Sequence, residues 1–489
     1  MPISPGRRLR ALRDRLLGTL WFVPALLVAG ALALAAGMVE LSARVDAEAL
    51  ARWPRLFGAE PDSSRSILSA VASGMITVAG LTFSLTMVAV TQASTQYTPR
   101  VLRSFMADRS NQVVLGVFVG IFAYCLVVLR TIRSDIEGTP FVPSLAVVLG
   151  IALAIVGIGV LIYFVHHIAS TLQASSLIAR VARETAAAID SLFPETLGAE
   201  GSGDATEVTR IAAAVGRWHA VPARVTGYVQ AVDESRLLAL AVRAGHLVRM
   251  ERGVGDFVIA GQPLASIAVD GPPTTTARGD RAVAPAAGAS SLDAIAHRLV
   301  RAWTIGEFRT VEQDAAFGVR QLVDVALKAL SPGINDSTTA ASCIDYLGAL
   351  LVRVADRRIE SPLRTHPDDV GGREAGRAPG SGAAAMERAP VRVLARGPSF
   401  HGLLRLACDE IRRCAGGNVR VLDQLATMLA MVAEATERPD RRRAILEQLA
   451  LLDEVARRTV QAPAEREALR HACAEAVAVA SRPTLPRSA

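Results

Sequence analysis

The sequence predicts a multi-pass α-helical membrane protein with four transmembrane helices and a cytoplasmic α+β region. Of its 489 residues, 51% are hydrophobic, and most of these lie before residue 170. The mean hydropathy of +0.33 is too high for an ordinary soluble protein of this length. Four stretches, about 21–43, 66–94, 112–132 and 142–166, reach the roughly 18 to 20 apolar residues that cross a bilayer as helix. Because the first stretch is longer than the apolar core of a signal peptide, we expect it to remain as a span.

The distribution of arginine predicts the orientation of these spans. The N-terminal arm (1–20) and the loop after the second span are basic, whereas the other two loops mix arginine with acidic residues. Positive charge favours the cytoplasmic side, so we expect both termini and residues 171–489 in the cytoplasm. We also expect the arm to bind anionic lipid head groups. The arginines of the two basic segments are Arg7, Arg8, Arg10, Arg13 and Arg15, then Arg100, Arg103 and Arg109.

The second span carries small polar residues on one side. At about 100° per residue they share an arc of about 80°, while the rest of the helix is apolar. A helix that faces lipid all round gains nothing from such a stripe, so this side is expected to meet protein or water. It therefore either lines a pore or packs against another helix, and both interpretations remain open. This polar stripe of the second span consists of Ser69, Ser73, Thr77, Gly80, Ser84, Thr91 and Thr95.

Beyond the membrane the pattern changes from helical to β-rich. The fourth span is expected to continue as one helix to about residue 193, within a cytoplasmic helical extension and linker (171–219). In the β-rich module, 220–269, we expect a strand pair over 221–232 and hairpins over 237–269 that turn at Gly253, Gly255 and Gly261. The spacing of glycine and apolar residues in this module resembles the barrel-sandwich half of biotinyl and lipoyl domains. These carriers attach their cofactor to a hairpin lysine, which the module lacks, so it is expected to be structural or to bind a small ligand.

Further helices are predicted after the β-rich module. Residues 290–359 form a helical segment with a Ser-Pro-Gly-Ile-Asn-Asp turn, and 361–390 form a disordered linker rich in Gly, Pro and Ala. Residues 391–396 are suited to a strand that returns to the β-rich module. The C-terminal helical segment, 391–480, then holds three or four amphipathic helices, with breaks near Gly416–Gly417, Pro439 and Pro463.

The densest group of polar residues lies between 309 and 347. On the predicted helix that ends at Ser331, polar side chains line one face and apolar side chains the other. Two interpretations remain open: a solvated face followed by a capped turn, or an anion or small-ligand site at the start of the next helix. A metal site formed by its aspartates is disfavoured, since they lack the close spacing of a calcium loop. The candidate ligand residues are Arg309, Gln313, Asp314, Gln321, Asp324, Lys328, Asn335 and Asp336.

Several function classes lack their motifs. Lys328 is the only lysine, which leaves no place for a P-loop, a kinase lysine or a biotin site. No residue set suggests catalysis, a metal, a cofactor or nucleic-acid binding, so we expect no enzyme. No charged residue lies deep in a span, which disfavours a cation-coupled carrier. The five cysteines show no CxxC spacing and are expected to be reduced core thiols: Cys125, Cys343, Cys408, Cys414 and Cys473.

Several long motifs resemble a family of predicted bacterial membrane proteins, the domain of unknown function 2254. The longest is RTVEQDAAFGVRQLVDVALKALSPGIND (309–336), and the chain differs from the family pattern at Glu307-Phe308, Lys328 and Ser337. The resemblance implies four spans in the bacterial inner membrane and a cytoplasmic β-plus-helix domain, and it implies no activity. The other matching pieces are QYTPRVLRSFMADRSNQVVLGVFVGIFAYCLVVL (96–129), FVHHIASTLQ (164–173), GYVQAVD (227–233), GDFVIAGQPL (255–264) and TTAASCIDYL (338–347).

Two functions therefore remain as the main hypotheses, and a membrane enzyme is a third and weaker one for want of a recognisable nucleophile, acid–base pair or metal cluster. The first is an oligomeric channel or pore, lined by the polar stripe of the second span and regulated by the cytoplasmic domain. The second is a non-conducting, membrane-anchored scaffold or a ligand or stress sensor, in which the stripe packs against the first and third spans. The lipid bilayer is the expected partner in both cases, with a homo-oligomer expected for the channel.

Overall fold

The computed structural model describes most of the chain as two compact units, Met1–Leu177 and Ile178–Ala489. The predicted basic arm (1–20) and most of the predicted disordered linker lie outside the described residues. The structure describes residues 21–44, 60–96, 109–133, 141–171, 173–192, 205–269, 289–311, 313–357, 359, 363–365 and 391–482.

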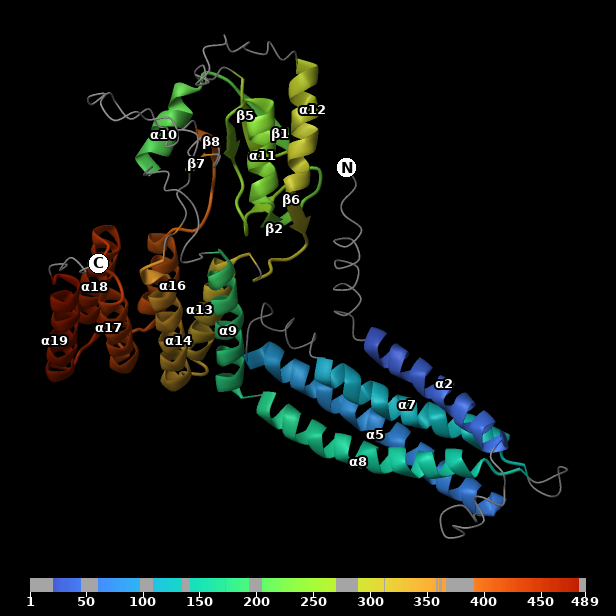
Figure 1. Ribbon diagram of the computed structural model, residues 1–489. Helices are drawn as coiled ribbons and strands as arrows, with labels where there is room; N and C mark the ends of the chain where they lie inside the picture. The colour runs from blue at the N-terminus through green and yellow to red at the C-terminus, as the bar shows by residue number, and fades with distance from the viewer. Residues whose placement is uncertain are drawn as a thin grey trace, which may run out of the picture. The chain divides into compact units, whose positions relative to one another are not determined.

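The first unit is a bundle of four long helices (Figure 1): α2 (Phe22–Arg44), α5 (Pro61–Gln96), α7 (Arg109–Thr131) and α8 (Ser144–Thr171). Each lies where the sequence predicts a span. Helix α7 contacts all three of the others, and α5 and α2 also contact α8. The bundle core is largely apolar and includes the fully buried side chains of Leu68, Phe118, Tyr124 and Phe164.

Small residues let the helices of the bundle approach closely. A side chain at Gly116 would collide with Leu27 and with the Pro24 backbone, and one at Gly120 would touch Ala31. The Gly116/Gly120 pair of α7 is therefore used for packing against α2 within one chain, which is the usual role of small residues in membrane helix pairs. The Tyr124 hydroxyl donates a 2.8 Å hydrogen bond to the carbonyl of Ala146 and so links α7 to α8.

The predicted continuation of the fourth span as one helix is wrong. Helix α8 ends at Thr171, and α9 begins at Ala174 and runs to Leu192. The carbonyl of Gln173 accepts the N–H groups of Ser176 and Leu177, which starts a new helix. A short helix, α10 (Ala205–Ala214), follows.

Two sheets follow in the second unit. The order of the five-stranded sheet is β1-β5-β3-β8-β7, in which only β3 and β8 are parallel, and the order of the antiparallel three-stranded sheet is β4-β2-β6. The strands are β1 (Trp218–Pro222), β2 (Gly227–Val232), β3 (Val248–Met250), β4 (Phe257–Val258), β5 (Pro263–Ala268), β6 (Trp303–Gly306), β7 (Leu363–Thr365) and β8 (Val391–Leu394).

The predicted strands over 221–269 are partly wrong. Strands β1 and β2 do not pair with each other, because β1 pairs with β5, and β2 with β4 and β6. Residues Glu234–Ala244 form a helix, α11, rather than a strand. Asp233 caps its first turn and Gly245, with φ of +69°, ends it, while Leu237 and Ala241 pack one turn apart into the core.

Distant segments complete this module. Helix α12 (Ala289–Leu299) contacts α11, and the short 3₁₀ turn Val300–Ala302 leads into β6, where the sequence predicts only helix. Strand β8 pairs with β3 and confirms the predicted return to the β-rich module. Strand β7 lies inside the predicted disordered linker, so that prediction is wrong for Leu363–Thr365.

The remainder of the second unit is helical: α13 (Ala315–Ala329), α14 (Ser337–Ala355), α16 (Phe400–Cys414), α17 (Val419–Glu434), α18 (Pro439–Thr459) and α19 (Pro463–Ala480). The last four confirm the C-terminal helices, with the breaks where Gly and Pro predict them. All five cysteines are free, and four are buried. Cys414 is exposed, so the expectation of a core thiol is wrong there, because Cys414 ends α16 on its solvent side.

Five helices of the described residues are long and apolar enough to cross a membrane. Four are the helices of the bundle, and the fifth is α14.

Candidate functional site

The polar stripe of the second span, the α5 stripe, faces away from the bundle. Ser69, Ser73, Thr77, Gly80, Ser84 and Thr91 are all exposed, and the side chain of Thr95 lies outside the described residues. The opposite side of α5 is buried against its neighbours through Leu68, Ala72, Met75, Ala79, Thr82 and Ala89. Within one chain, therefore, the stripe does not pack against the first and third spans, contrary to the scaffold hypothesis in its original form. The packing side of α5 is the apolar and alanine-rich one.

Threonine hydroxyls of α5 are bonded to their own helix. Thr77 donates to the carbonyl of Ser73 (2.7 Å) and Thr91 to that of Met87 (2.9 Å). Thr86 donates in the same way to the carbonyl of Thr82. These bonds give the hydroxyls an acceptor without a neighbouring helix, so the threonines of the stripe tolerate an apolar as well as an aqueous surrounding.

The polar face of α13 is buried, so the solvated face expected from the sequence is wrong. Asp314, Gln321 and Asp324 expose only 5%, 6% and 6% of their surface, and Phe317 is buried among them. Helix α13 is covered by α14 and α16, and α9 meets it where Thr185 touches Gly318. Buried charges require partners, and the described partners of Asp314 and Asp324 all belong to the chain.

Asp314 forms a cap and an ion pair at the start of α13. One carboxylate oxygen accepts the N–H of Phe317 (2.9 Å), and the other accepts two N–H groups of Arg309 (2.7 and 2.9 Å). The Arg309 guanidinium also lies 5.0 Å above the Phe317 ring. A bidentate partner, a helix cap and a cation–π contact together hold the charge in place.

The segment 307–314 also forms hydrogen bonds with the three-stranded sheet. The Gln313 side-chain oxygen accepts the N–H of Val232 (3.1 Å), and the Gln230 amide donates to the Phe308 carbonyl (2.7 Å). Gly255, with φ of +88°, comes so close that a Cβ would lie 2.5 Å from an Asp314 oxygen. The motifs around 227–233, 255–264 and 309–314 thus meet at one seam between the sheet and α13, and the chain's own groups fill it.

A second cluster lies farther along α13. Arg320 donates to Asp324 (2.7 Å) and pairs with Glu410 of α16. The hydrogen bond to Glu410, together with both negative charges, raises the pKa of Arg320. Arg320 and Glu410 are not among the candidate residues predicted from the sequence, although the spacing of Arg320 and Asp324 by four residues is a signal of such a pair.

The turn before α14 is capped by Asp336. Its carboxylate accepts the N–H groups of Thr338 and Thr339 and the Thr339 hydroxyl, which lowers its pKa. Asn335 precedes the cap in the left-handed region, with φ of +49°, and is not itself the cap. Because the carboxylate of Asp336 accepts the Thr338 and Thr339 amides, these two donors are not available to an anion.

The candidate ligand residues therefore do not form one site. Arg309 and Asp314 lie at the start of α13, whereas Lys328, Asn335 and Asp336 lie at its end. A helix of 15 residues spans about 22 Å, which separates the two groups. Within the described part of the chain, no group of three or more His, Cys, Asp or Glu side chains could hold a metal ion.

Comparisons with known proteins agree with a membrane protein. The family described as "Predicted membrane protein (DUF2254)" matches residues 18–373. The chain is 33% identical over 476 residues to an uncharacterized protein of Mycobacterium bovis, which covers 97% of this chain and 83% of the relative. Uncharacterized proteins of two Mycobacterium tuberculosis strains show the same identity and coverage. No solved structure matches.

Proposed function

Since the chain belongs to this family of predicted membrane proteins, we propose that it is a homo-oligomeric, channel-like protein of the bacterial inner membrane. In this proposal α2, α5, α7 and α8 are the only spans, both termini are cytoplasmic, and the α5 stripes of several copies face a shared path. The 178–489 unit regulates that path. The observation that carries the proposal is the outward position of the α5 stripe on an otherwise closed bundle.

The surroundings of α14 support four spans rather than five. Its charged residues are engaged within the second unit, since Arg353 donates to Asp190 (2.7 Å) and Asp345 accepts from Gln424. Arg441, almost fully buried, donates to the last carbonyls of α14. A helix whose charges and end are bonded in this way is expected in the core of a soluble unit, not in lipid.

The interior of the bundle is too well packed to conduct. Leu68, Phe118, Tyr124 and Phe164 are fully buried side chains in its core. A conducting path lined by polar groups must therefore form between copies of the chain. The stripe is the polar surface that α5 offers for such a path.

The 178–489 unit supports a regulatory rather than a catalytic role. Its densest polar groups are paired internally, as the Arg309–Asp314 and Arg320–Asp324 contacts illustrate. The only lysine of the chain, Lys328, lies on α13, so the β-rich module supports no carrier chemistry, whether or not it is of the barrel-sandwich kind. A unit whose polar groups are bonded internally is suited to transmit a binding event to the spans.

A non-conducting scaffold or sensor is the second candidate. Thr77 and Thr91 satisfy their hydroxyls within α5, which suits a dry seam between two copies as well as a wet path. In this case the stripe still meets another subunit, but no ion crosses.

Ion flux into liposomes that contain the purified protein distinguishes the candidates. If the stripe lines a path, Thr77→Leu and Ser84→Leu abolish the flux, while Leu85→Ile, a change on the exposed side outside the stripe, preserves it. Absence of flux in the wild-type protein over a range of ions and pH would overturn the proposal that it is a channel.

Disulfide cross-linking tests the assembly that both candidates require. Ser73→Cys is made in a Cys414→Ser background, because the other native cysteines are buried. Oxidation in membranes is expected to give a cross-linked pair at position 73 and none for a matched Leu85→Cys variant. Monomer alone in both variants would overturn the shared role of the stripe.

A further inference from the structure

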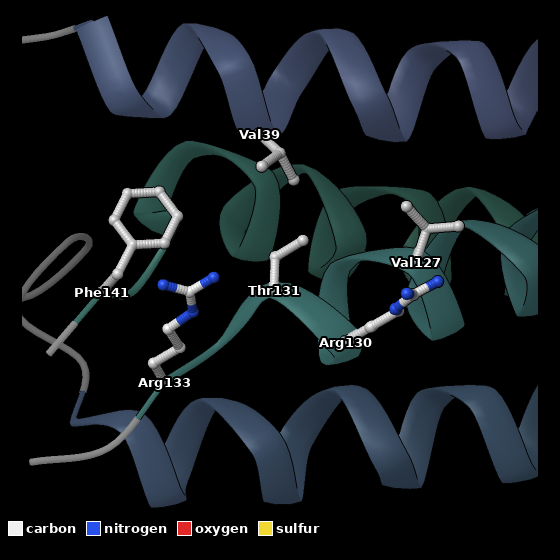
Figure 2. A pocket seen from close by; sticks show the side chains of 6 residues that line it. All are labelled: Val39, Val127, Arg130, Thr131, Arg133 and Phe141. Atoms are coloured by element: carbon white, nitrogen blue, oxygen red, sulfur yellow. The ribbon is translucent and has the colours of Figure 1, made fainter. Parts of the chain in front are cut away.

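A cavity of about 550 Å³ lies at the end of the bundle where α2 and α7 end and α8 begins. Its volume falls within the range of about 300–1,000 Å³ that is usual for small-molecule sites. Val39 comes from α2, Val127, Arg130 and Thr131 from the last turns of α7, and Arg133 and Phe141 from the connection between α7 and α8 (Figure 2).

The backbone holds Arg133 and Phe141 side by side. The N–H of Arg133 donates to the Phe141 carbonyl (3.0 Å), and the N–H of Phe141 donates to the Arg133 carbonyl (3.3 Å). The guanidinium of Arg65 donates to the Ile132 carbonyl (2.7 Å) and anchors the same turn to α5. Backbone hydrogen bonds and a contact from α5 therefore hold the wall of the cavity in place.

The lining combines positive charge with an apolar wall. Figure 2 shows the Arg133 guanidinium between Phe141 and Thr131, Thr131 below Val39, and the guanidinium of Arg130 beside Val127. Among the described residues, no carboxylate is paired with Arg130 or Arg133, and the Glu40 carboxylate beside Val39 is bonded to Arg44 (2.8 Å). Two guanidinium groups at one cavity attract an anion, and phosphate oxygens match their planar donor geometry.

We propose that this cavity binds the phosphate head group of an anionic phospholipid. Its place at the end of the bundle helices, on the outer face of the membrane in the proposed orientation, is where head groups lie, and two guanidinium groups suit their phosphates. Arg130 and Arg133 bind the phosphate, and Val39, Val127 and Phe141 contact the glycerol backbone and the first acyl methylenes. The Thr131 hydroxyl donates to the Val128 carbonyl (2.7 Å), so it completes the wall without donating to the phosphate. The site is distinct from the α5 stripe and does not depend on conduction.

Lipid binding to the full-length protein in detergent tests this proposal. Native mass spectrometry measures the retention of phosphatidylglycerol against phosphatidylcholine, and inorganic phosphate and glycerol 3-phosphate are added as competitors. We expect wild-type protein to retain phosphatidylglycerol selectively. Arg130→Gln and Arg133→Gln should each weaken this retention roughly tenfold, which is the loss of one charge-assisted hydrogen-bonded contact. Arg44→Gln, on the same end of the bundle but paired with Glu40, serves as the matched control.

A second variant separates binding from folding. Val39→Trp fills the cavity without removing charge and should also abolish selective retention, while the thermal unfolding midpoint shows that each variant is folded. Equal retention of phosphatidylglycerol by wild type and by a folded double Arg130→Gln/Arg133→Gln variant would overturn the proposal. Competition by inorganic phosphate at the concentration where the lipid binds would also overturn it, in favour of a free-phosphate site.

Discussion

Helices α5 and α13 both carry a polar stripe on an otherwise apolar helix, and the structure places the two stripes in opposite surroundings. On α5 the stripe is exposed and its threonines bond to their own backbone. On α13 the stripe is buried and its aspartates bond to arginines. A threonine hydroxyl finds its acceptor in a carbonyl of its own helix, whereas a buried carboxylate needs a positioned partner such as an arginine side chain. The chemistry of a polar stripe, more than its periodicity, therefore decides which surroundings it tolerates.

The largest effect is expected when a buried charge on α13 loses its partner. Asp314→Ala removes the cap of α13 and leaves Arg309 without its bidentate acceptor. We expect a loss of about 3 kcal/mol in the free energy of unfolding, measured as a lower denaturation midpoint of the full-length protein. Asp314→Asn should lose less, because an amide oxygen still caps the helix. An Asp314→Ala variant as stable as wild type would show that the contacts of Asp314 contribute nothing to the free energy of unfolding.

The same glycine substitution on the two helices sharpens the comparison. A Cβ at Gly318 of α13 would collide with the Thr185 side chain of α9, whereas nothing lies within 4 Å of a Cβ at Gly80 of α5. Gly318→Ala is expected to cost about 2 kcal/mol, and Gly80→Ala to be neutral or slightly stabilising. Thermal unfolding of both variants measures the difference. Equal midpoints would mean that α9 does not pack on α13 in the way described.

A smaller effect is expected at the cap of α14. Asp336→Ala should cost about 1 kcal/mol, as is usual for a lost N-cap. Because hydrogen bonds lower the pKa of Asp336 from its ordinary 3.8, its contribution is complete above about pH 4 and is lost as the pH falls through the folded-state pKa. The stability difference between wild type and Asp336→Ala should therefore shrink in acid. A difference that stays constant down to pH 2 would contradict the assignment.

The smallest effect is expected on the stripe itself. Ser73→Leu should change the stability of the single chain by less than about 0.5 kcal/mol, since this position is exposed. Its neighbour Ala72 is buried, so Ala72→Leu should overpack the bundle and cost about 1–3 kcal/mol. Thermal unfolding at low protein concentration, where assembly is disfavoured, compares the two. Equal losses would place the stripe inside the bundle.

Much of the helical architecture follows from the sequence because its signals are local. Apolar length predicts the four bundle helices. Gly416–Gly417 follow the end of α16, and Pro439 and Pro463 begin α18 and α19. The capping role of Asp336 is likewise decided within one turn. The site residues are harder to place from the sequence, because Glu410, a partner of Arg320, and Val232, the partner of Gln313, lie far away in the chain.

The wrong predictions share a physical cause, which is that the local pattern of apolar and polar residues does not decide the structure at these places. Residues 234–244 are apolar enough for a strand, and only the Asp233 and Gly245 caps indicate the helix that forms. Strand β6 follows a helix directly and pairs with β2, some seventy residues earlier, so no local pattern indicates it. The buried face of α13 contains the residues of a solvated face, and only the arginines Arg309 and Arg320 reveal why it can be buried.

Strands β7 and β8 have a consequence for engineering. They pair antiparallel, with Thr365 opposite Val391, so both ends of the intervening segment 366–390 are held next to each other by hydrogen bonds. The entropy of closing such a loop rises only slowly with its length, by about 0.6 kcal/mol per doubling. A fluorescent protein or an affinity tag inserted between these strands would therefore extend the loop while leaving the sheet register intact, and relatives are free to differ in length there.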